Sequence, residues 1–136
     1  MIVIRDHVPS DLDFVYSSWL SNYQHSSYFA RRIRKQTFMT EYSKILNALM
    51  LRDNVTCKIA GDDEFSIYGY IVSEPDCVHY VYVRPEYHML GIAKRLITEV
   101  GLQDGDFEVS SWTPALNDIS FKYRNMRYNP FRLLGV

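Results

Sequence analysis

The sequence lacks the features that mark several classes of protein. It has no apolar run approaching the roughly 20 residues of a membrane-spanning helix, and residues 1–6 lack the charged and apolar blocks of a secretory signal. It contains only two cysteines, Cys57 and Cys77, and its net charge is −1. We therefore expect free thiols, a cytoplasmic location and no general attraction to membranes or nucleic acid.

Two catalytic patterns are also missing. No group of cysteine, histidine and acidic residues has the spacing of metal ligands, so we expect no metal site. No Gly-x-Ser-x-Gly sequence is present. Repeats, linkers and low-complexity tracts are absent too, and 136 residues suffice for one hydrophobic core. We therefore expect a single domain over residues 1–136.

Helical periodicity predicts two helices in the first half of the chain. Apolar residues recur every three or four positions after Leu12 and again after Thr40. Ser10 with Asp13 resembles a capping box for the first helix, and Thr40 has the side chain of an N-cap for the second. Helices therefore follow the first short strand.

The rest of the chain reads mainly as strands. Runs rich in β-branched and aromatic residues lie at residues 2–5, 55–60, 65–73, 76–83 and 107–111. A last short helix is expected over residues 117–124, and sheet-edge pairing over residues 128–134. The mixture predicts an α+β fold.

The segment around Gly91 is the most informative. A strand-forming run ends at Pro85, and an amphipathic helix with Leu96 on its apolar face follows Gly91 and ends near Gly101. The first N–H groups of a helix have no internal partner, and the helix dipole favours negative charge there. This turn is therefore a candidate anion site.

The same segment resembles motif A of the GNAT-type N-acetyltransferase superfamily, whose signature is Gln/Arg-x-x-Gly-x-Gly/Ala. Gly91 and Ala93 match its last two positions, whereas His88 stands where Gln or Arg is usual and Met89 where glycine is common. A protonated His88 would still bring positive charge. In that family, main-chain amides of the turn bind the pyrophosphate of acetyl-coenzyme A. The resemblance implies cosubstrate binding by His88, Met89, Leu90, Gly91, Ile92 and Ala93.

A second resemblance lies near the C-terminus. Asn117-x-x-Ser120 and the later Tyr123 are similar to the family's late segment, Asn-x-x-Ala followed by Tyr-x-x-hydrophobic-Gly-Phe. The spacing to Tyr123 is one residue shorter than usual, and Arg127 replaces the glycine. The resemblance implies a mixed, mainly antiparallel sheet flanked by helices, with Asn117 near the cosubstrate. The compact chain is also similar to acetyltransferase-like proteins of tailed phages.

The resemblance further implies transfer of an acetyl group from acetyl-coenzyme A to an amine of a small molecule or a protein lysine. Main-chain amides around Tyr82, Val83 and Arg84 would hold the pantetheine and polarise the thioester carbonyl. Tyr123 would protonate the leaving thiolate. Family members often dimerise, so a homodimer is compatible with the resemblance.

The general base is open at this point. His79 is the first candidate, because an imidazole can accept a proton near neutral pH, and Asp76 and Glu74 are the others. Water could also take the proton. His79 could equally be a hydrogen-bonded core histidine and Tyr123 a packing residue.

Two other functions compete with acetyl transfer. The departures at Met89 and Arg127 are compatible with a degenerate GNAT scaffold that binds a partner or coenzyme A without turnover. Two basic clusters with neighbouring aromatic residues are compatible with nucleic-acid binding. They comprise Arg31, Arg32, Arg34 and Lys35, and Lys122, Arg124, Arg127 and Arg132. A solvated basic face is the simpler interpretation of both.

Overall fold

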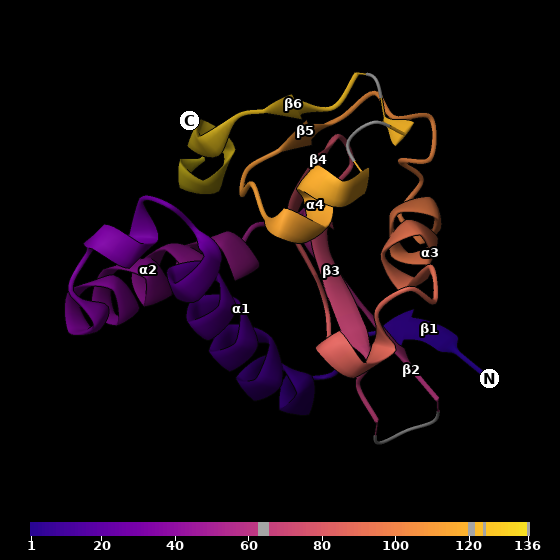
Figure 1. The fold of residues 1–136 in the computed structure, drawn as a ribbon, viewed down its shortest axis with the longest axis horizontal. Helices are drawn as coiled ribbons and strands as arrows, with labels where there is room; N and C mark the ends of the chain where they lie inside the picture. Colours follow the sequence, from indigo (N-terminus) through magenta and orange to yellow (C-terminus); the bar gives the residue numbers. More distant parts are fainter. Residues whose placement is uncertain (63–65, 120–121, 124, 136) are drawn as a thin grey trace.

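The computed structural model describes residues 1–62, 66–119, 122, 123 and 125–135 (Figure 1). The sheet strands are β1 (Val3–Asp6), β2 (Thr56–Gly61), β3 (Gly69–Glu74), β4 (Cys77–Val83), β5 (Glu108–Val109) and β6 (Arg127–Tyr128). The α-helices are α1 (Leu12–Ser26), α2 (Lys35–Met50), α3 (Ile92–Glu99) and α4 (Pro114–Ile119). Short 3-10 helices are η1 (Pro9–Asp11), η2 (Ala30–Arg32), η3 (Pro85–Tyr87) and η5 (Pro130–Leu134). The predicted α+β class is confirmed.

The described strands form one sheet in the order β1 to β6. Strands β1 to β4 are antiparallel, whereas β5 runs parallel to β4 and β6 runs parallel to β5. The predicted mixed, mainly antiparallel sheet is therefore confirmed. Between β3 and β4, Val72 pairs with Tyr80 and the next residue of β3, Ser73, pairs with Val78. His79 of β4 therefore has no partner residue in β3 and is the extra residue of a β-bulge.

Helices cover both faces of this sheet. Helices α1 and α2 lie on one side and α3 on the other (Figure 1). Strand residues alternate between the two faces, so Tyr80 packs under α1 and α2 while Val81 packs towards α3. The rings of Trp19 and Tyr80 stack with centroids 4.7 Å apart, which anchors α1 to β4.

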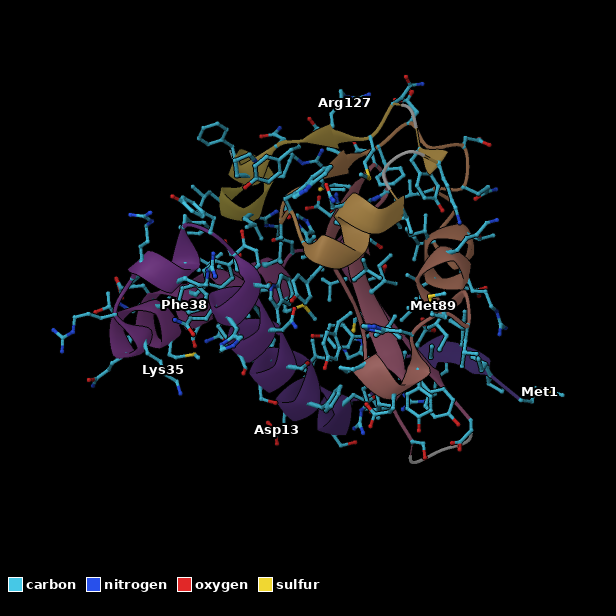
Figure 2. All side chains as sticks on the ribbon, in the orientation of Figure 1. Met1, Asp13, Lys35, Phe38, Met89 and Arg127 are labelled. Carbon is cyan, nitrogen blue, oxygen red and sulfur yellow. The ribbon has the colours of Figure 1, made fainter. Side chains whose placement is uncertain are left out.

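Two expected helix starts are wrong. Helix α2 begins at Lys35, so Thr40 lies inside it rather than at its N-cap. Phe38 is buried and extends the apolar face by one turn beyond the predicted pattern (Figure 2). The capping box of Ser10 and Asp13 is replaced by another, because the amide of Val8 donates to the Asp11 carboxylate at 2.8 Å.

The C-terminal elements differ from prediction in extent. Helix α4 starts at Pro114 and ends at Ile119, whereas the predicted helix spanned residues 117–124. Residues 120, 121 and 124 of that prediction lie outside the described residues. Of residues 128–134, Tyr128 pairs in the sheet, and Pro130–Leu134 form η5. A proline at the start favours a helical turn because its φ is fixed and it needs no N–H partner there.

Membrane-spanning helices, metal-binding groups and disulfides are all absent from the described residues. Among the described residues, no helix is long and apolar enough to cross a membrane. Over the same part of the chain, no three histidine, cysteine or acidic side chains gather into a metal-binding group. Cys57 and Cys77 are free, as predicted, and both are buried.

Candidate functional site

Strand β4 has an unpaired edge at its C-terminal end. Its pairing with β5 covers only Cys77 and Val78, and the amide of Ser110 donates to the Val78 carbonyl at 3.0 Å. Within the described residues, β4 has no partner on this side beyond that point. The two parallel strands therefore separate, and the main chain of β4 is left open between them.

The alternation of an antiparallel strand decides which peptide groups face the opening. The amide of Arg84 donates to the Tyr68 carbonyl at 2.8 Å, so Arg84 is directed towards β3. Tyr82, two residues earlier, has the same direction, whereas Val81 and Val83 face the open side. The amides of Val81 and Val83 can therefore bind an extended ligand, whereas the Val83 carbonyl lies 2.9 Å from His88 Nε2.

This geometry corrects part of the predicted amide set. The Arg84 amide is already bonded and the Tyr82 amide points to the neighbouring strand. The amide of Val83 faces the open side, and its binding of a ligand stays a prediction. Val81 was missed because the sequence does not show which alternate residues face a partner strand.

A cavity of about 110 Å³ lies at the open edge. It is lined by residues 81–83 of β4, by Pro85 and His88, by Asn22 and Ser26 of α1, and by Thr113. The four-residue spacing of Asn22 and Ser26 is a helical signal that could have pointed to them. Thr113 left no such signal, because it comes from beyond β5.

The turn between η3 and α3 contains two left-handed residues. Met89 has a φ of 71° and Gly91 a φ of 73°, a conformation that favours glycine. This explains why glycine suits the position that Met89 occupies. Met89 is 99% exposed at the start of α3, so its side chain contributes little packing in return (Figure 2).

The main-chain amides of this turn are mostly free. The His88 amide donates to the Pro85 carbonyl at 3.2 Å, and the helical ladder of α3 begins with the Arg95 amide on the Gly91 carbonyl. Residues 89–93, which are all described, have no protein acceptor for their amides. A helix start with free N–H groups suits a phosphate or diphosphate. The residues present therefore fit the phosphate part of a coenzyme.

The three candidate bases lie in a separate network. His79 is fully buried, with Nδ1 2.7 Å from Ser110 Oγ and Nε2 2.7 Å from Glu74 Oε1. Glu74 also accepts from Arg52 at 2.9 Å, and Asp76 pairs with Arg132 at 2.7 Å. None of the three candidates lines the cavity at β4. Their catalytic role stays a prediction that this geometry does not favour.

Electrostatics agree with a structural role for His79. Burial lowers the pKa of His79, and this outweighs the opposing effect of Glu74. Burial raises the pKa of Glu74, but hydrogen bonds from His79 and Arg52 outweigh it and lower the pKa overall. A neutral imidazole that donates to a carboxylate and accepts from a serine satisfies every group.

Tyr123 lies in the core on the α3 side. Its ring contacts Phe107 edge to face, with centroids 5.5 Å apart, and only 6% of its surface is exposed. Burial raises the pKa of its hydroxyl. Tyr123 does not line the cavity at β4, so its role as general acid also stays a prediction.

A second, larger cavity adjoins the first. It has a volume of about 530 Å³ and shares Ser26 and Thr113 with the cavity at β4. Asn117, predicted to lie near the cosubstrate, lines this cavity instead of the turn. The remaining lining is aromatic, from Tyr23, Tyr28, Phe29, Trp112 and Tyr128, and we call the whole space the aromatic cavity.

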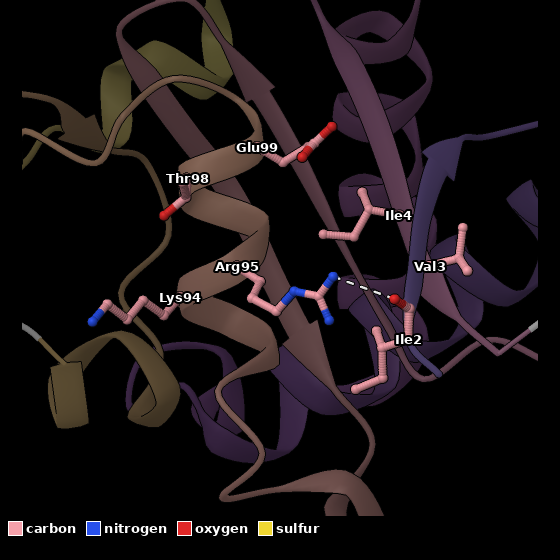
Figure 3. Close-up of a pocket in the computed structure, with 7 residues that line it drawn as sticks. All are labelled: Ile2, Val3, Ile4, Lys94, Arg95, Thr98 and Glu99. Carbon is pink, nitrogen blue, oxygen red and sulfur yellow. Dashed lines mark hydrogen bonds between the residues drawn. The ribbon is translucent and has the colours of Figure 1, made fainter.

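A third hollow lies between α3 and β1 (Figure 3). Arg95 reaches across it and donates to the Ile2 carbonyl at 3.3 Å. Lys94 and Glu99 lie on its helix side. It shares no lining residue with the other two cavities, so it is not an extension of the site.

Two arginines of the second basic cluster are paired with carboxylates. Arg132 pairs with Asp76 and Glu108 at 2.7 Å each, and Arg127 pairs with Asp106 at 3.0 Å. Arg124 lies outside the described residues, and Lys122 has its own interaction. The second basic cluster is therefore not an unpaired basic face.

Comparisons with known proteins bear on the fold. No protein-family model matches the sequence, and no curated protein matches it. Several solved structures, in contrast, resemble this fold. A GCN5-related N-acetyltransferase from Rhodopseudomonas palustris superposes with a TM-score of 0.60 at 14% identity, and the alignment covers 88% of this chain and 79% of that one.

A PaiA N-acetyltransferase from Thermoplasma acidophilum, solved in complex with coenzyme A, gives a TM-score of 0.53 at 20% identity. The alignment covers 73% of this chain and 69% of that one. At such identities the likeness concerns the arrangement of the backbone. The chain has the fold of the GNAT-type N-acetyltransferases.

Proposed function

We propose that the protein is an N-acetyltransferase that moves an acetyl group from acetyl-coenzyme A to an amine. One observation carries the proposal: free amides of residues 89–93 lie next to the open edge of β4. A diphosphate at the turn and a pantetheine along Val81 and Val83 would occupy both. The coenzyme A complex of the similar Thermoplasma protein supports this choice of ligand.

The chemistry requires three events. The amine loses a proton, because an ammonium has no lone pair, and its nitrogen then attacks the thioester carbonyl carbon. The carbon–sulfur bond then breaks with its electron pair on sulfur, and the acetyl group stays on nitrogen. The nitrogen gives up a second proton and the coenzyme A sulfur takes up one, which leaves a neutral amide and a free thiol. Negative charge develops on the carbonyl oxygen, so an unpaired amide of Val81 or Val83 would stabilise it.

Proton transfer is the less defined part. The cavity at β4 is lined by polar groups such as Asn22, Ser26 and Thr113, which can hold a water molecule beside the amine. We propose that water carries the amine proton away. Tyr123 remains the proposed acid for the thiolate on the strength of the family resemblance alone.

Coenzyme binding tests the proposal directly. Acetyl-coenzyme A should bind the purified chain by calorimetry and raise its melting temperature. Gly91→Glu should abolish binding, because it adds a negative charge at the turn. Gly101→Glu is the matched control, since Gly101 is also left-handed and open but lies at the other end of α3.

The result that contradicts the proposal is equally clear. No binding at millimolar acetyl-coenzyme A, or equal loss in both glycine variants, would reject the turn as the phosphate site. Binding without acetylation over a broad panel of amines and peptides would instead identify a coenzyme-binding protein on this scaffold.

A further inference from the structure

Exposed aromatic side chains gather in one place. Among the described residues, the exposed aromatic side chains are Tyr28, Phe29, Tyr128 and Phe131. The first three line the aromatic cavity, and Phe131 does not. Leaving apolar rings in water costs free energy, so three of them around one hollow indicate a ligand that covers them.

The rings come from distant parts of the chain. Trp112 meets Tyr128 edge to face with centroids 6.2 Å apart, and Tyr23 meets Phe29 in the same way at 5.9 Å. In the first pair, Trp112 follows β5 and Tyr128 lies in β6. In the second pair, Tyr23 lies near the end of α1 and Phe29 lies in the loop after it. The cavity is therefore bounded by one aromatic pair from the N-terminal part of the chain and one from the C-terminal part.

Ser26 connects the aromatic cavity with the proposed position of the thioester. It lines both cavities, and its Oγ is buried without a hydrogen-bond partner in the described structure. A buried hydroxyl without a partner is unfavourable, so this oxygen gains from a hydrogen bond that a bound donor supplies. The N–H of an amine is such a donor.

The charges argue against a polycationic ligand. No charged side chain lines the aromatic cavity in the described part of the chain. The guanidinium of Arg32 already lies over the Tyr28 ring at 4.7 Å and donates to its hydroxyl at 2.6 Å. Residues 14–40, which lead into and out of this region, contain no Asp or Glu. The face of the Tyr28 ring is thus already occupied by one cation. Residues 14–40 offer no carboxylate that could neutralise a second cation.

We propose that the aromatic cavity binds the acceptor, and that this acceptor is a small primary amine carried on a flat ring with no second positive charge. The ring contacts Trp112 and Tyr128, and the amine hydrogen-bonds to Ser26. This inference rests on the proposed function, because it assigns the cavity to the amine of that reaction.

Binding of matched amines to the full chain tests the inference. Calorimetry compares 2-phenylethylamine with butylamine, which has the same charge but no ring, and with spermidine, which has several charges. The aromatic amine should bind about tenfold more tightly than butylamine, the size of one good ring contact. Equal or tighter binding of butylamine or spermidine would overturn the inference.

Variants locate the binding. Tyr128→Ala and Trp112→Ala should each remove most of the preference for the ring, and Ser26→Ala should weaken all amines about equally. Phe131→Ala is the matched control, because it removes an exposed aromatic ring outside the cavity. Tyr128 is half exposed, so its variant keeps the test usable even where Trp112→Ala fails to fold. An unchanged preference in Tyr128→Ala, or an equal loss in Phe131→Ala, would overturn the inference.

The amine titrations are run without and with coenzyme A, which separates the two proposals. Coenzyme binding without the ring preference would reject the acceptor assignment alone. A ring preference that depends on Tyr128, in a chain that does not bind coenzyme A, would support the cavity as an amine site and reject the transferase.

Discussion

The imidazole of His88 lies 2.9 Å from the carbonyl oxygen of Val83 through its Nε2 atom. Since a carbonyl only accepts, Nε2 carries the hydrogen and donates it. Val83 is the last residue of β4, and His88 opens the turn before α3. The bond therefore fixes the turn of free amides relative to the open strand edge, so the proposed diphosphate and pantetheine positions keep one spacing.

His88→Ala should weaken acetyl-coenzyme A binding by about three- to tenfold, the worth of one hydrogen bond. The amides of residues 89–93 remain, but their position relative to Val83 is no longer fixed. Calorimetry measures the affinity. His88→Gln, which can still donate to Val83, should retain more of it, and an unchanged affinity in His88→Ala would contradict this role.

Met89→Gly should leave the protein as stable or stabilise it by up to about 1 kcal/mol, because a left-handed conformation costs a side chain more than glycine. Leu90→Gly is the control, since its φ is not positive and the change only adds flexibility to the unfolded chain. Urea unfolding gives both free energies. If Met89→Gly loses as much stability as Leu90→Gly, the left-handed conformation of Met89 is not strained.

The buried His79 should make stability depend on pH. Its pKa is lowered by burial from the ordinary 6.5, so the unfolded chain takes up a proton below about pH 6.5 that the folded chain refuses. The free energy of unfolding should therefore fall as pH falls from about 7 towards 5. Its slope corresponds to at most one proton, because one group titrates. The lowered pKa of Glu74 adds a further loss only below about pH 4.5.

Urea unfolding at several pH values measures this effect. His79→Gln removes the titrating group and keeps an amide in its place, so the decline near pH 6 should become shallower. A decline of the same size in the variant would mean that another group causes it.

Both thiols should resist alkylation in the folded protein. Cys57 and Cys77 are buried, and burial raises the pKa of each to about 12. At about pH 8 almost no reactive thiolate is present. Mass spectrometry after iodoacetamide should show no label in buffer and two labels in concentrated guanidinium chloride. Rapid labelling of either thiol in buffer would contradict the packing.

The sequence predicted the elements whose signals are local. Helix α3 and its limits followed from Gly91, Gly101 and the apolar spacing between them, and both glycines are indeed left-handed. The strand runs were found for the same reason, since alternation and β-branched residues act within a few positions. The start of α2 was missed because residues 35–37 are exposed polar residues. Phe38 and Met39 alone are too few to show the apolar spacing of a helix in this first turn.

The site depended more on long-range contacts. The free amides of the turn were predicted, because the first N–H groups of a helix lack partners by local geometry. The exposure of Val81 and Val83 was not, since it depends on the register of β4 against β3 and on where β5 departs. The burial of His79 at the bulge likewise requires the partner strand.

By itself, then, the sequence determined an α+β chain in which a strand, a glycine and a helix follow one another, and it predicted that the first amides of this helix form an anion site. Only the tertiary structure decided which side chains surround that turn. Tyr28 and Tyr128 share a cavity although a hundred residues separate them in the chain. Such contacts arise when the sheet brings distant segments together, and no local pattern of residues encodes that closure.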